Sequence, residues 1–345
     1  MNRVLITGGA GFIGSNLADN LLSEGHQVTV FDSLARKGAE RNVEWLRVRH
    51  GDALRMVHGD VRDYDSLAEA ARGAEIIYHF ASQVAVTTSV TDPRTDFEVN
   101  ALGSFNALEV ARKLTTNPIF VFTSTNKVYG AMEDVVVIEK ETRYEYRDFP
   151  QGIDESRPLD FHSPYGCSKG AADQYIRDYA RIYGLRTVVF RMSCIYGPRQ
   201  FGVEDQGWLA HFIISVVLGR PITIYGNGKQ VRDVLYIDDL VRAFRLAPEH
   251  IDVTAGQVYN IGGGADNVLS VWVEFKESLA PLLGCRVEAA DYGDWRPGDQ
   301  PIYVSDTSKA ARDFDWRPHV GMEDGIARLC RWIETNKELI QQEVL

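Results

Sequence analysis

Hydrophobic and polar positions along the first half of the chain alternate between short apolar runs and longer segments with helical spacing. The apolar runs read "RVLITG", "QVTVFD", "MVHGDV", "EIIYHFAS", "PIFVFTS" and "RTVVFRMS". Each run is followed by an amphipathic or apolar-periodic stretch that is typical of a helix. The near-continuous hydrophobicity of the runs is typical of parallel strands that are buried on both faces. The pattern therefore predicts an α/β fold with a Rossmann-type, doubly wound parallel sheet.

The regular alternation holds to about residue 195 and then stops. The remainder contains "ITIYGNG", "VYNIGGG", a helical run over residues 270–283 and a C-terminal helix, without a repeating strand and helix order. We therefore expect two domains. Residues 1–195 would carry the large sheet, and residues 196–345 would form a smaller mixed α/β domain, with the chain crossing between the two.

One connector is much longer than the others. Residues 130–163 separate the fifth apolar run from the next helix, whereas loops in βα units usually have about 2–6 residues. The connector contains "RYEYRDFPQGIDESRPLDFHS", which is rich in aromatic side chains and mixed charge. Two interpretations stay open, a surface excursion and a loop that covers a substrate.

Composition and charge narrow the classes of function. The chain has 345 residues, of which 45% are hydrophobic and 25% charged, and a formal net charge of −11. The charge argues against a general attraction to nucleic acid or to an anionic membrane. The first apolar run begins at Arg3 and no long apolar run follows, so we expect a cytoplasmic protein. The four cysteines show neither a CxxC pair nor metal-like spacing with histidine, so no metal site or disulfide is expected.

A glycine motif follows the first apolar run directly. In "TGGAGFIGSNLA", Gly9, Gly11 and Gly14 satisfy the spacing G-x-G-x-x-G between a strand and a helix. Glycines in this pattern allow a tight turn and bring a pyrophosphate against the backbone at the N-terminus of the helix. The motif, within a βαβ unit, predicts a dinucleotide site.

Two aspartates refine this prediction. Asp32 closes the second apolar run, where a carboxylate would hydrogen-bond the ribose hydroxyls of the adenosine. It would repel a 2′-phosphate, which favours NAD over NADP, although Arg36 and Lys37 follow closely. Asp60 follows the third run, where it could reach the adenine amino group or simply form a turn.

An acid and base pair is predicted at the start of the helix after the connector. Tyr165 and Lys169 are four residues apart in "SPYGCSKG", so both lie on one helix face. A lysine beside the phenol, together with a positive nicotinamide ring, would lower the tyrosine pKa towards neutrality and make it a general base. Ser124 and Thr125 end the fifth apolar run, at the sheet edge where α/β folds bind ligands.

These motifs, with "STNKVYG", "YGPRQ" and "GKQVRDVLYIDDL", resemble the extended short-chain dehydrogenase/reductase family of nucleotide-sugar enzymes over nearly the whole chain. The longer motifs are most similar to 2-epimerases of CDP-linked hexoses. The resemblance implies a catalytic set of Thr125, Tyr165 and Lys169. It implies that the first domain binds NAD through these two catalytic residues of the helix and through Gly8, Gly11, Phe12, Ile13, Gly14, Asp32, Asp60, Val61, Ala81 and Asn100. It places the nucleotide sugar mainly on the second domain and against Ser124, Asn126, Cys194, Arg232 and Arg296.

The resemblance also implies a reaction and an assembly. Dehydratases of this fold carry two carboxylates after the catalytic threonine, whereas this chain has Asn126 and Lys127, which disfavours dehydration. We expect an isomerase that epimerises C2 through a transient 2-keto sugar, with a nucleotide-sugar 4-epimerase as the alternative and a non-catalytic NAD sensor as a different class. Cys194 replaces a frequent asparagine, and a small buried apolar role is expected for it. Arg232 and Arg296 would grip the pyrophosphate or form surface salt bridges. A homodimer or homotetramer is expected.

Overall fold

A seven-stranded parallel sheet forms the centre of the computed structural model, which describes residues 1–296 and 299–344. The strand order is β12-β8-β5-β4-β1-β2-β3, and every neighbouring pair is parallel. The strands are β1 (Arg3–Thr7), β2 (Gln27–Asp32), β3 (Leu54–His58), β4 (Ile76–His79), β5 (Ile119–Thr125), β8 (Arg186–Met192) and β12 (Gln257–Ile261). This order, which reverses at β1, is the doubly wound arrangement. The expected fold class is confirmed.

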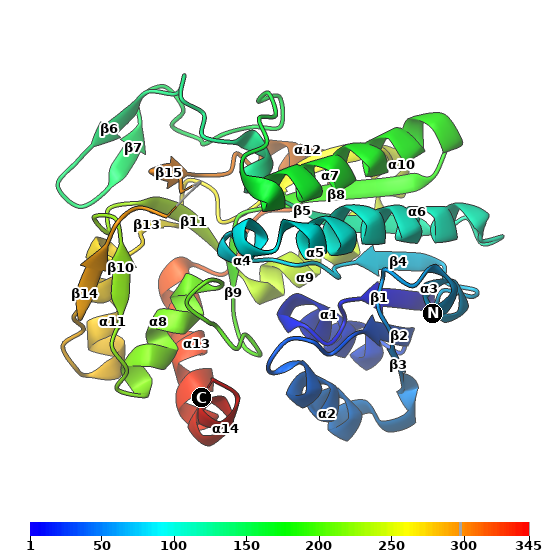
Figure 1. The fold of residues 1–345 in the computed structure, drawn as a ribbon, viewed down its shortest axis with the longest axis horizontal. Helices are drawn as coiled ribbons and strands as arrows, with labels where there is room; N and C mark the ends of the chain where they lie inside the picture. Colours follow the sequence, from blue (N-terminus) through cyan, green and yellow to red (C-terminus); the bar gives the residue numbers. More distant parts are fainter. Residues whose placement is uncertain (297–298, 345) are drawn as a thin grey trace.

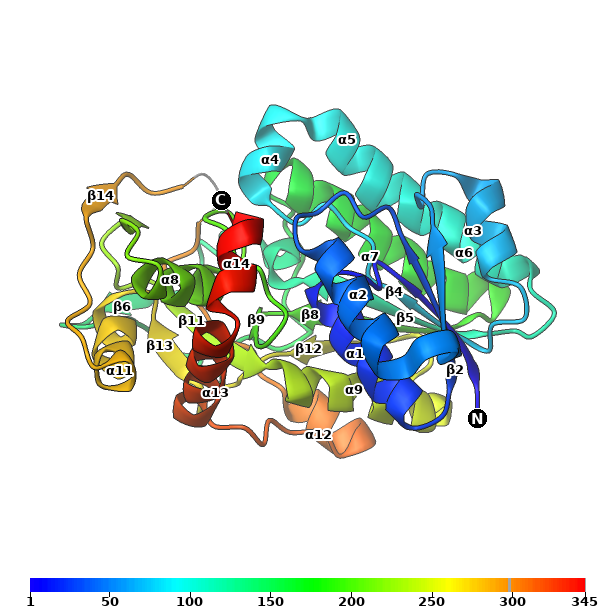
Figure 2. The same cartoon turned by 90° about the horizontal axis from the view of Figure 1, so that it is seen from below.

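Helices cover both faces of this sheet (Figures 1 and 2). Successive residues of β1 point to opposite sides, so that Val4 and Ile6 join one hydrophobic cluster and Leu5 joins the other. The first cluster includes side chains of α1 (Phe12–Ser23), α2 (Ala39–His50) and α9 (Ile237–Glu249). The second includes those of α3 (Tyr64–Ala70), α6 (Gly103–Lys113) and α7 (Ser163–Tyr183). The short helices α4 (Val86–Thr91) and α5 (Pro93–Phe97) and a π-helical turn, η2 (Glu98–Leu102), lead into α6.

A smaller α/β part lies beyond the carboxyl ends of the large sheet. Its main sheet joins β9 (Cys194–Tyr196), β11 (Val231–Tyr236), β13 (Val268–Ser270) and β15 (Ile302–Tyr303), while β10 (Thr223–Tyr225) pairs with β14 (Asp291–Gly293). Its helices are α8 (Trp208–Val217), α11 (Val273–Leu283), α13 (Met322–Thr335) and α14 (Lys337–Val344). The first hydrophobic cluster continues from α1 and α9 into this part through Trp272 and Leu329, so the two parts share one core.

The chain crosses between the two parts more than once. After residue 196 it returns to the large sheet, where α9 packs against α1 and β12 pairs with β8. The helices α10 (Ile251–Thr254) and α12 (Ser308–Phe314) contact β12. The run "VYNIGGG", which the sequence pattern assigned to the smaller domain, therefore begins in the large sheet. At the edge of that sheet, the side chains of Val258, Tyr259 and Ile261 are buried.

The long connector packs against the smaller part. It forms a hairpin of β6 (Val137–Glu139) and β7 (Tyr144–Tyr146), visible at one end of the molecule in Figure 1. The Tyr146 hydroxyl donates to the carbonyl oxygen of Ile302 at 3.0 Å, and the Ile153 amide donates to Val304 at 2.8 Å. Two 3₁₀ turns, η1 (Gly51–Ala53) and η3 (Asn126–Tyr129), complete the elements. Among the residues that the structure describes, no helix is long and apolar enough to cross a membrane.

Candidate active site

A cavity of about 550 Å³ lies at the carboxyl edge of the large sheet, where that edge faces the smaller part. Ligands of open α/β sheets bind at this edge. Most residues that the sequence predicted for a site line the cavity: Gly8, Gly11, Phe12, Ile13, Gly14, Asp32, Asp60, Val61, Ala81, Ser124, Thr125, Tyr165, Lys169 and Cys194. Four predicted residues do not line it, namely Asn100, Asn126, Arg232 and Arg296. Within the described chain, the lining also contains no residue of the 130–163 connector, so the connector does not cover this cavity.

The glycine turn leaves space for a pyrophosphate because side chains are absent there. Gly8 has φ +69°, a conformation that favours glycine. A Cβ atom on Gly14 would lie 2.4 Å from the carbonyl oxygen of Gly8, so only glycine fits where α1 passes the turn. The helix begins at Phe12, directly after Gly11, and its N-terminal amides lie at the cavity. Gly9 packs against Val30 and does not line the cavity. These residues fit the dinucleotide that the motif predicts.

The two aspartates predicted to contact the adenosine both line the cavity. Asp32 accepts hydrogen bonds from the amides of Ala10 at 3.0 Å and Leu34 at 2.8 Å. Burial raises the pKa of Asp32, and these amide bonds act in the opposite direction. Asp60 pairs with Arg62 at 2.7 Å, and this hydrogen bond lowers the pKa of Asp60. Both carboxylates are therefore held in place and face the cavity.

The expected acid and base residues also meet at the cavity. Thr125 ends β5, and Tyr165 and Lys169 lie in the first turns of α7, whose second residue is Pro164, in the first turn where proline is tolerated. The Thr125 hydroxyl hydrogen-bonds the Tyr165 phenol. The Lys169 Nζ donates to the carbonyl oxygen of Thr123 at 2.6 Å. The three functional groups thus face the same space.

The protein's own groups do not lower the phenol pKa. Burial raises the pKa of Tyr165 to about 12, against a lowering contribution from the Thr125 hydrogen bond. Burial also lowers the pKa of Lys169 to about 7, although Asp173 and Asp96 favour its charged form. Desolvation thus dominates for both groups in the protein alone. The expected phenol near neutrality also requires the positive nicotinamide ring, so it stays a prediction for the NAD-bound enzyme.

Asn100 supports the cavity wall from behind. It lies in the π-helical turn η2. Such turns are rare in proteins, and those that occur are often found at functional sites. Its Nδ2 donates to Asp96 and Ser168, both at 3.1 Å, and its Oδ1 accepts from the amide of Gln83 at 2.8 Å. Gln83 lines the cavity. Asn100 therefore ties this wall to α7 without lining the cavity itself, and its expected contact with the cofactor stays a prediction.

Cys194 and Asn126 lie on the predicted substrate side. The indole nitrogen of Trp208 donates to the Cys194 sulfur at 3.4 Å, and burial raises the pKa of the thiol. Cys194 is therefore a neutral side chain in the cavity wall. Asn126 is buried in η3, and its Oδ1 accepts from the Thr125 hydroxyl at 3.3 Å.

The two predicted phosphate-binding arginines already have acidic partners. Arg232 is buried and bonds Asp299 at 3.3 Å. The positive charge of Arg232 acts to lower the pKa of the Cys194 thiol, so this charge is felt at the cavity wall. Arg296 lies 3.9 Å from the ring centroid of Tyr225 and pairs with Glu204 at 3.3 Å. Both arginines thus lie outside the cavity lining in ion pairs.

Two segments from opposite parts of the molecule meet at the cavity. Residues 36–42, which include the start of α2, follow β2, and residues 198–206 follow β9. Arg36 bonds Gln206, and Asn42 Nδ2 donates to the carbonyl of Arg199 at 3.5 Å. Asn16 of α1 also donates through Nδ2 to the carbonyl of Pro198 at 3.1 Å. Glu343 of α14 accepts from the Gly38 amide at 3.1 Å and from Arg41 at 2.8 Å. The segments enclose the cavity from both sides.

Sequence reasoning missed the buried polar residues behind the catalytic groups. Asp96 is fully buried and accepts from Ser168 at 2.5 Å. Asp173 is also fully buried and follows Lys169 by four residues, so it lies on the same helix face. That spacing was the available signal, because a carboxylate on the buried face of a helix needs a partner. In the described part of the chain, no group of three or more His, Cys, Asp or Glu side chains could hold a metal ion.

Comparisons with known proteins agree with this geometry. Residues 4–262 match the NAD dependent epimerase/dehydratase family. The chain is 44% identical over 340 residues to CDP-paratose 2-epimerase of Salmonella typhi, covering 96% of this chain and 98% of that protein. Its structure is similar to that of UDP-glucose 4-epimerase of Thermotoga maritima, solved with UDP-glucose (30% identity, TM-score 0.83, 98% and 99% of the two chains). It is also similar to dTDP-glucose 4,6-dehydratase of Streptomyces venezuelae, solved with NAD and TYD (32% identity, TM-score 0.82, 98% of each chain).

The match spans the glycine turn, the end of β5 and the catalytic turn of α7, so cofactor and acid and base residues fall within one matched region. Family membership assigns NAD as the cofactor of the cavity. The chain therefore belongs to the NAD-dependent epimerase/dehydratase family of nucleotide-sugar enzymes.

Proposed function

We propose that this enzyme interconverts the C2 epimers of a CDP-linked hexose, of the type CDP-paratose and CDP-tyvelose. The observation that carries the proposal is the 44% identity, along almost the full length of both chains, to a relative named CDP-paratose 2-epimerase. Thr125, Tyr165 and Lys169 lie together at one end of the cavity and supply the acid and base groups that such a reaction needs.

Each catalytic residue has a distinct role. Tyr165 takes the proton from the C2 hydroxyl and later returns it, as a general base and acid. Thr125 hydrogen-bonds the reacting oxygen, and Lys169 holds the nicotinamide ribose and favours the phenolate through its charge. Bound NAD supplies the hydride acceptor and donor at the sugar carbon. Between the two transfers the 2-keto sugar turns within the cavity and presents its other face.

The residues after Thr125 support epimerisation over dehydration. Asn126 and Lys127 replace the two carboxylates that a dehydratase would need, and neither can act as a carboxylate base. Burial lowers the pKa of Lys127 to about 8, and Asp299 lies 3.9 Å from its Nζ. The acid and base pair of carboxylates expected of a dehydratase is therefore absent at these two positions.

The pyrophosphate is assigned to the two arginines of the smaller part. Arg232 and Arg296 would exchange their bonds with Asp299 and Glu204 for bonds with phosphate oxygens. Guanidinium forms charge-assisted bonds with phosphate as it does with carboxylate, so the substrate would replace one anionic partner with another. The nucleotide would then stay fixed while the sugar turns.

The proposal also includes a homodimer. Large apolar side chains are exposed on the layer of α4 to α7: Val90, Phe97, Leu102, Phe105, Tyr175, Ile182 and Tyr183. These helices pack against one another on one face of the large sheet (Figure 1). A second copy of this face would bury the side chains, and the dimer would place α7 near the interface.

A direct assay tests the proposed reaction. The purified protein is incubated with CDP-, GDP- and UDP-hexoses, and the products are resolved by NMR. Inversion at C2 of the CDP-linked sugar is expected. Inversion at C4 would identify a 4-epimerase instead. If no nucleotide sugar reduces the bound NAD or changes configuration, the protein is a non-catalytic NAD sensor.

A further inference from the structure

Three consecutive residues of β5 contact three successive turns of α7. The Thr125 hydroxyl bonds the phenol of Tyr165. The carbonyl oxygen of Thr123 accepts from Lys169 at 2.6 Å, and the Ser124 hydroxyl donates to Asp173 at 2.8 Å. The register of the helix along the strand end is therefore set by polar bonds that involve both catalytic residues of the helix.

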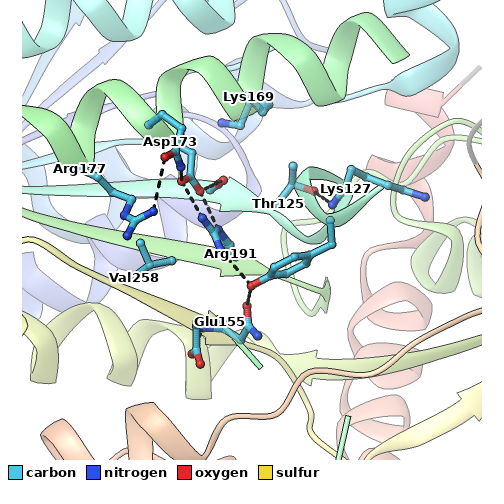
Figure 3. A network of polar contacts seen from close by, with 12 residues as sticks. Thr125, Lys127, Glu155, Lys169, Asp173, Arg177, Arg191 and Val258 are labelled. Carbon is cyan, nitrogen blue, oxygen red and sulfur yellow. Dashed lines mark hydrogen bonds and ion pairs between the residues drawn. The ribbon is translucent and has the colours of Figure 1, made fainter. Parts of the chain in front are cut away.

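Asp173 is held in turn by Arg191 (Figure 3). Its two carboxylate oxygens accept from Nε and Nη2 of Arg191, each at 2.9 Å, in a two-point ion pair. Asp173 is 0% exposed and Arg191 is 2% exposed. Arg191 lies on β8 directly beside Ser124 of β5, so the ion pair joins α7 to both strands.

The network continues away from the cavity. Arg191 Nη1 donates to the hydroxyl of Tyr129 at 3.2 Å, and this hydroxyl donates to Asn260 Oδ1 at 2.7 Å. Asn260 lies on β12, opposite Arg191. The ion pair is thus fixed by η3 and β12 on its far side, while its near side touches the catalytic residues of β5.

Stability alone is a poor explanation for such a pair. Desolvation of two buried charges offsets much of their attraction, and well-packed apolar residues of similar volume are often as stable. The pair joins the three elements that carry or flank Thr125, Tyr165 and Lys169, and it lies one helical turn from the Lys169 side chain. A role in positioning the catalytic residues explains why the ion pair lies between these elements.

We infer that Asp173 and Arg191 form a positioning unit that fixes the catalytic turn of α7 against the end of β5 and so places Lys169 and Tyr165 for the reaction. The kinetic consequence rests on the proposed function, whereas the placement of Lys169 does not. Asp173 touches neither the sugar nor the cofactor space, since it does not line the cavity.

The charge on Asp173 also reaches Lys169. The charged and titratable groups that interact with Lys169 are Asp173 on its own helix, Asp96 on α5 and His79 on β4. Burial lowers the pKa of His79 to about 3, so this ring is neutral at neutral pH. The two aspartates both favour the protonated lysine, and Asp173 is the larger influence.

The test uses the NAD-bound enzyme and two variants. Asp173→Asn keeps the shape of the side chain but removes its charge, and the double variant Asp173→Asn with Arg191→Met also removes the charge that would be left unpaired. Each protein is analysed for thermal unfolding, NAD content, kcat and KM. Protein with ¹³C at the lysine ε-carbons reports the titration of Lys169, assigned with Lys169→Met.

Asp173→Asn is expected to lower kcat by about 10- to 100-fold, the scale of small misplacements. The Lys169 titration should move to lower pH by about one unit, because a nearby opposite charge is lost. The double variant should regain thermal stability without regaining kcat. Glu274→Gln is the matched control, because it breaks the two-point pair with Arg143 in the smaller part and should leave kcat and the Lys169 titration unchanged.

Wild-type kcat and an unchanged Lys169 titration in folded Asp173→Asn would overturn the inference. Full recovery of kcat in the double variant would overturn it too, since the pair would then serve only stability. A double variant that fails to fold would also overturn the inference, because the pair would then be needed for stability. If the wild-type enzyme epimerises no nucleotide sugar, the proposed function fails, and the Lys169 titration still decides the positioning role.

Discussion

The Nζ of Lys169 donates a hydrogen bond of 2.6 Å to the main-chain carbonyl of Thr123. The amine lies 4.2 Å from the ring centroid of Phe122, and its side chain is buried. The hydrogen bond to the strand fixes the position of the amine, whereas burial disfavours its charged form. Burial accordingly lowers its pKa to about 7, so a small change in local charge changes its protonation near neutral pH.

This low pKa predicts how stability depends on pH. The pKa of Lys169 falls from 10.5 in the unfolded chain to about 7 in the fold, so between these values the unfolded chain binds more protons. The free energy of unfolding should therefore increase as pH rises from 7 to 10.5. Below pH 7 Lys169 is protonated in both states, and the full cost of burying its charge lowers the stability of the fold. Denaturant unfolding of the wild type and Lys169→Met across this range measures the difference. A difference that is constant with pH would contradict the low pKa.

Replacing Tyr165 with phenylalanine should preserve the fold and the bound NAD but reduce epimerisation by on the order of 10²- to 10⁴-fold, the usual range for a general base. The reason is that the phenol is the group that Thr125 contacts at the catalytic end of the cavity. Turnover and NAD content are measured together. Tyr292→Phe, at an exposed tyrosine of β14, is the matched control. Near-normal turnover of Tyr165→Phe would remove the base from the mechanism.

The hydrogen at C2 should not exchange with solvent. Hydride held within the cavity has no acidic form at that position, unlike the hydrogen of an epimerase that deprotonates carbon. Reaction in D₂O is expected to give product with essentially no deuterium at C2, as read by NMR or mass spectrometry. A C2-deuterated substrate should keep its label. Stoichiometric deuterium at C2 in the first turnover would exclude the hydride route.

Arg232→Met should raise KM by about tenfold or more, since a charge-assisted bond to phosphate exists in ground and transition states alike. Arg296→Met should act in the same direction. Some loss of kcat is expected if the sugar turns less faithfully. Arg286→Met, at an exposed arginine with an ion-pair partner, should leave KM unchanged. If both site variants keep the wild-type KM, the pyrophosphate binds elsewhere.

The exposed apolar layer predicts the assembly. Phe97→Glu should shift the protein towards monomers in sedimentation velocity, because Phe97 is 58% exposed among other apolar side chains of α4 to α7. Val48→Glu, which changes an isolated side chain that is 88% exposed on α2, should not. A wild-type protein that is monomeric at high concentration would exclude this interface.

Local signals made most of the fold predictable. The glycine turn and the six apolar runs each lie within one βα unit, so short-range patterns identify them. The seventh strand was misplaced because β12 is specified by its partner β8, which lies far away in the sequence. Similarly, the connector's place depends on contacts between Ile153 and β15 neighbours such as Val304, which no local pattern reveals.

The site followed the same rule. Tyr165, Lys169 and Thr125 were recognisable because their motifs are local, and the structure places them together. The partners of Asn100 could not be predicted, because its burial depends on the π-helical turn and on Asp96, Gln83 and Ser168, whereas its role toward the cofactor stays a prediction. Spacing along a helix does not show burial, so the sequence could not reveal how strongly desolvation raises the phenol pKa in the protein alone.

The contacts between residues 36–42 and 198–206, together with Glu343, link coenzyme exchange to the opening of the whole molecule. If the dinucleotide lies in this cavity, its release would require these segments to separate, although they are more than a hundred residues apart in the chain. The proposed epimerisation returns NAD to its original oxidation state and needs no such exchange. We therefore expect one bound coenzyme to serve many turnovers.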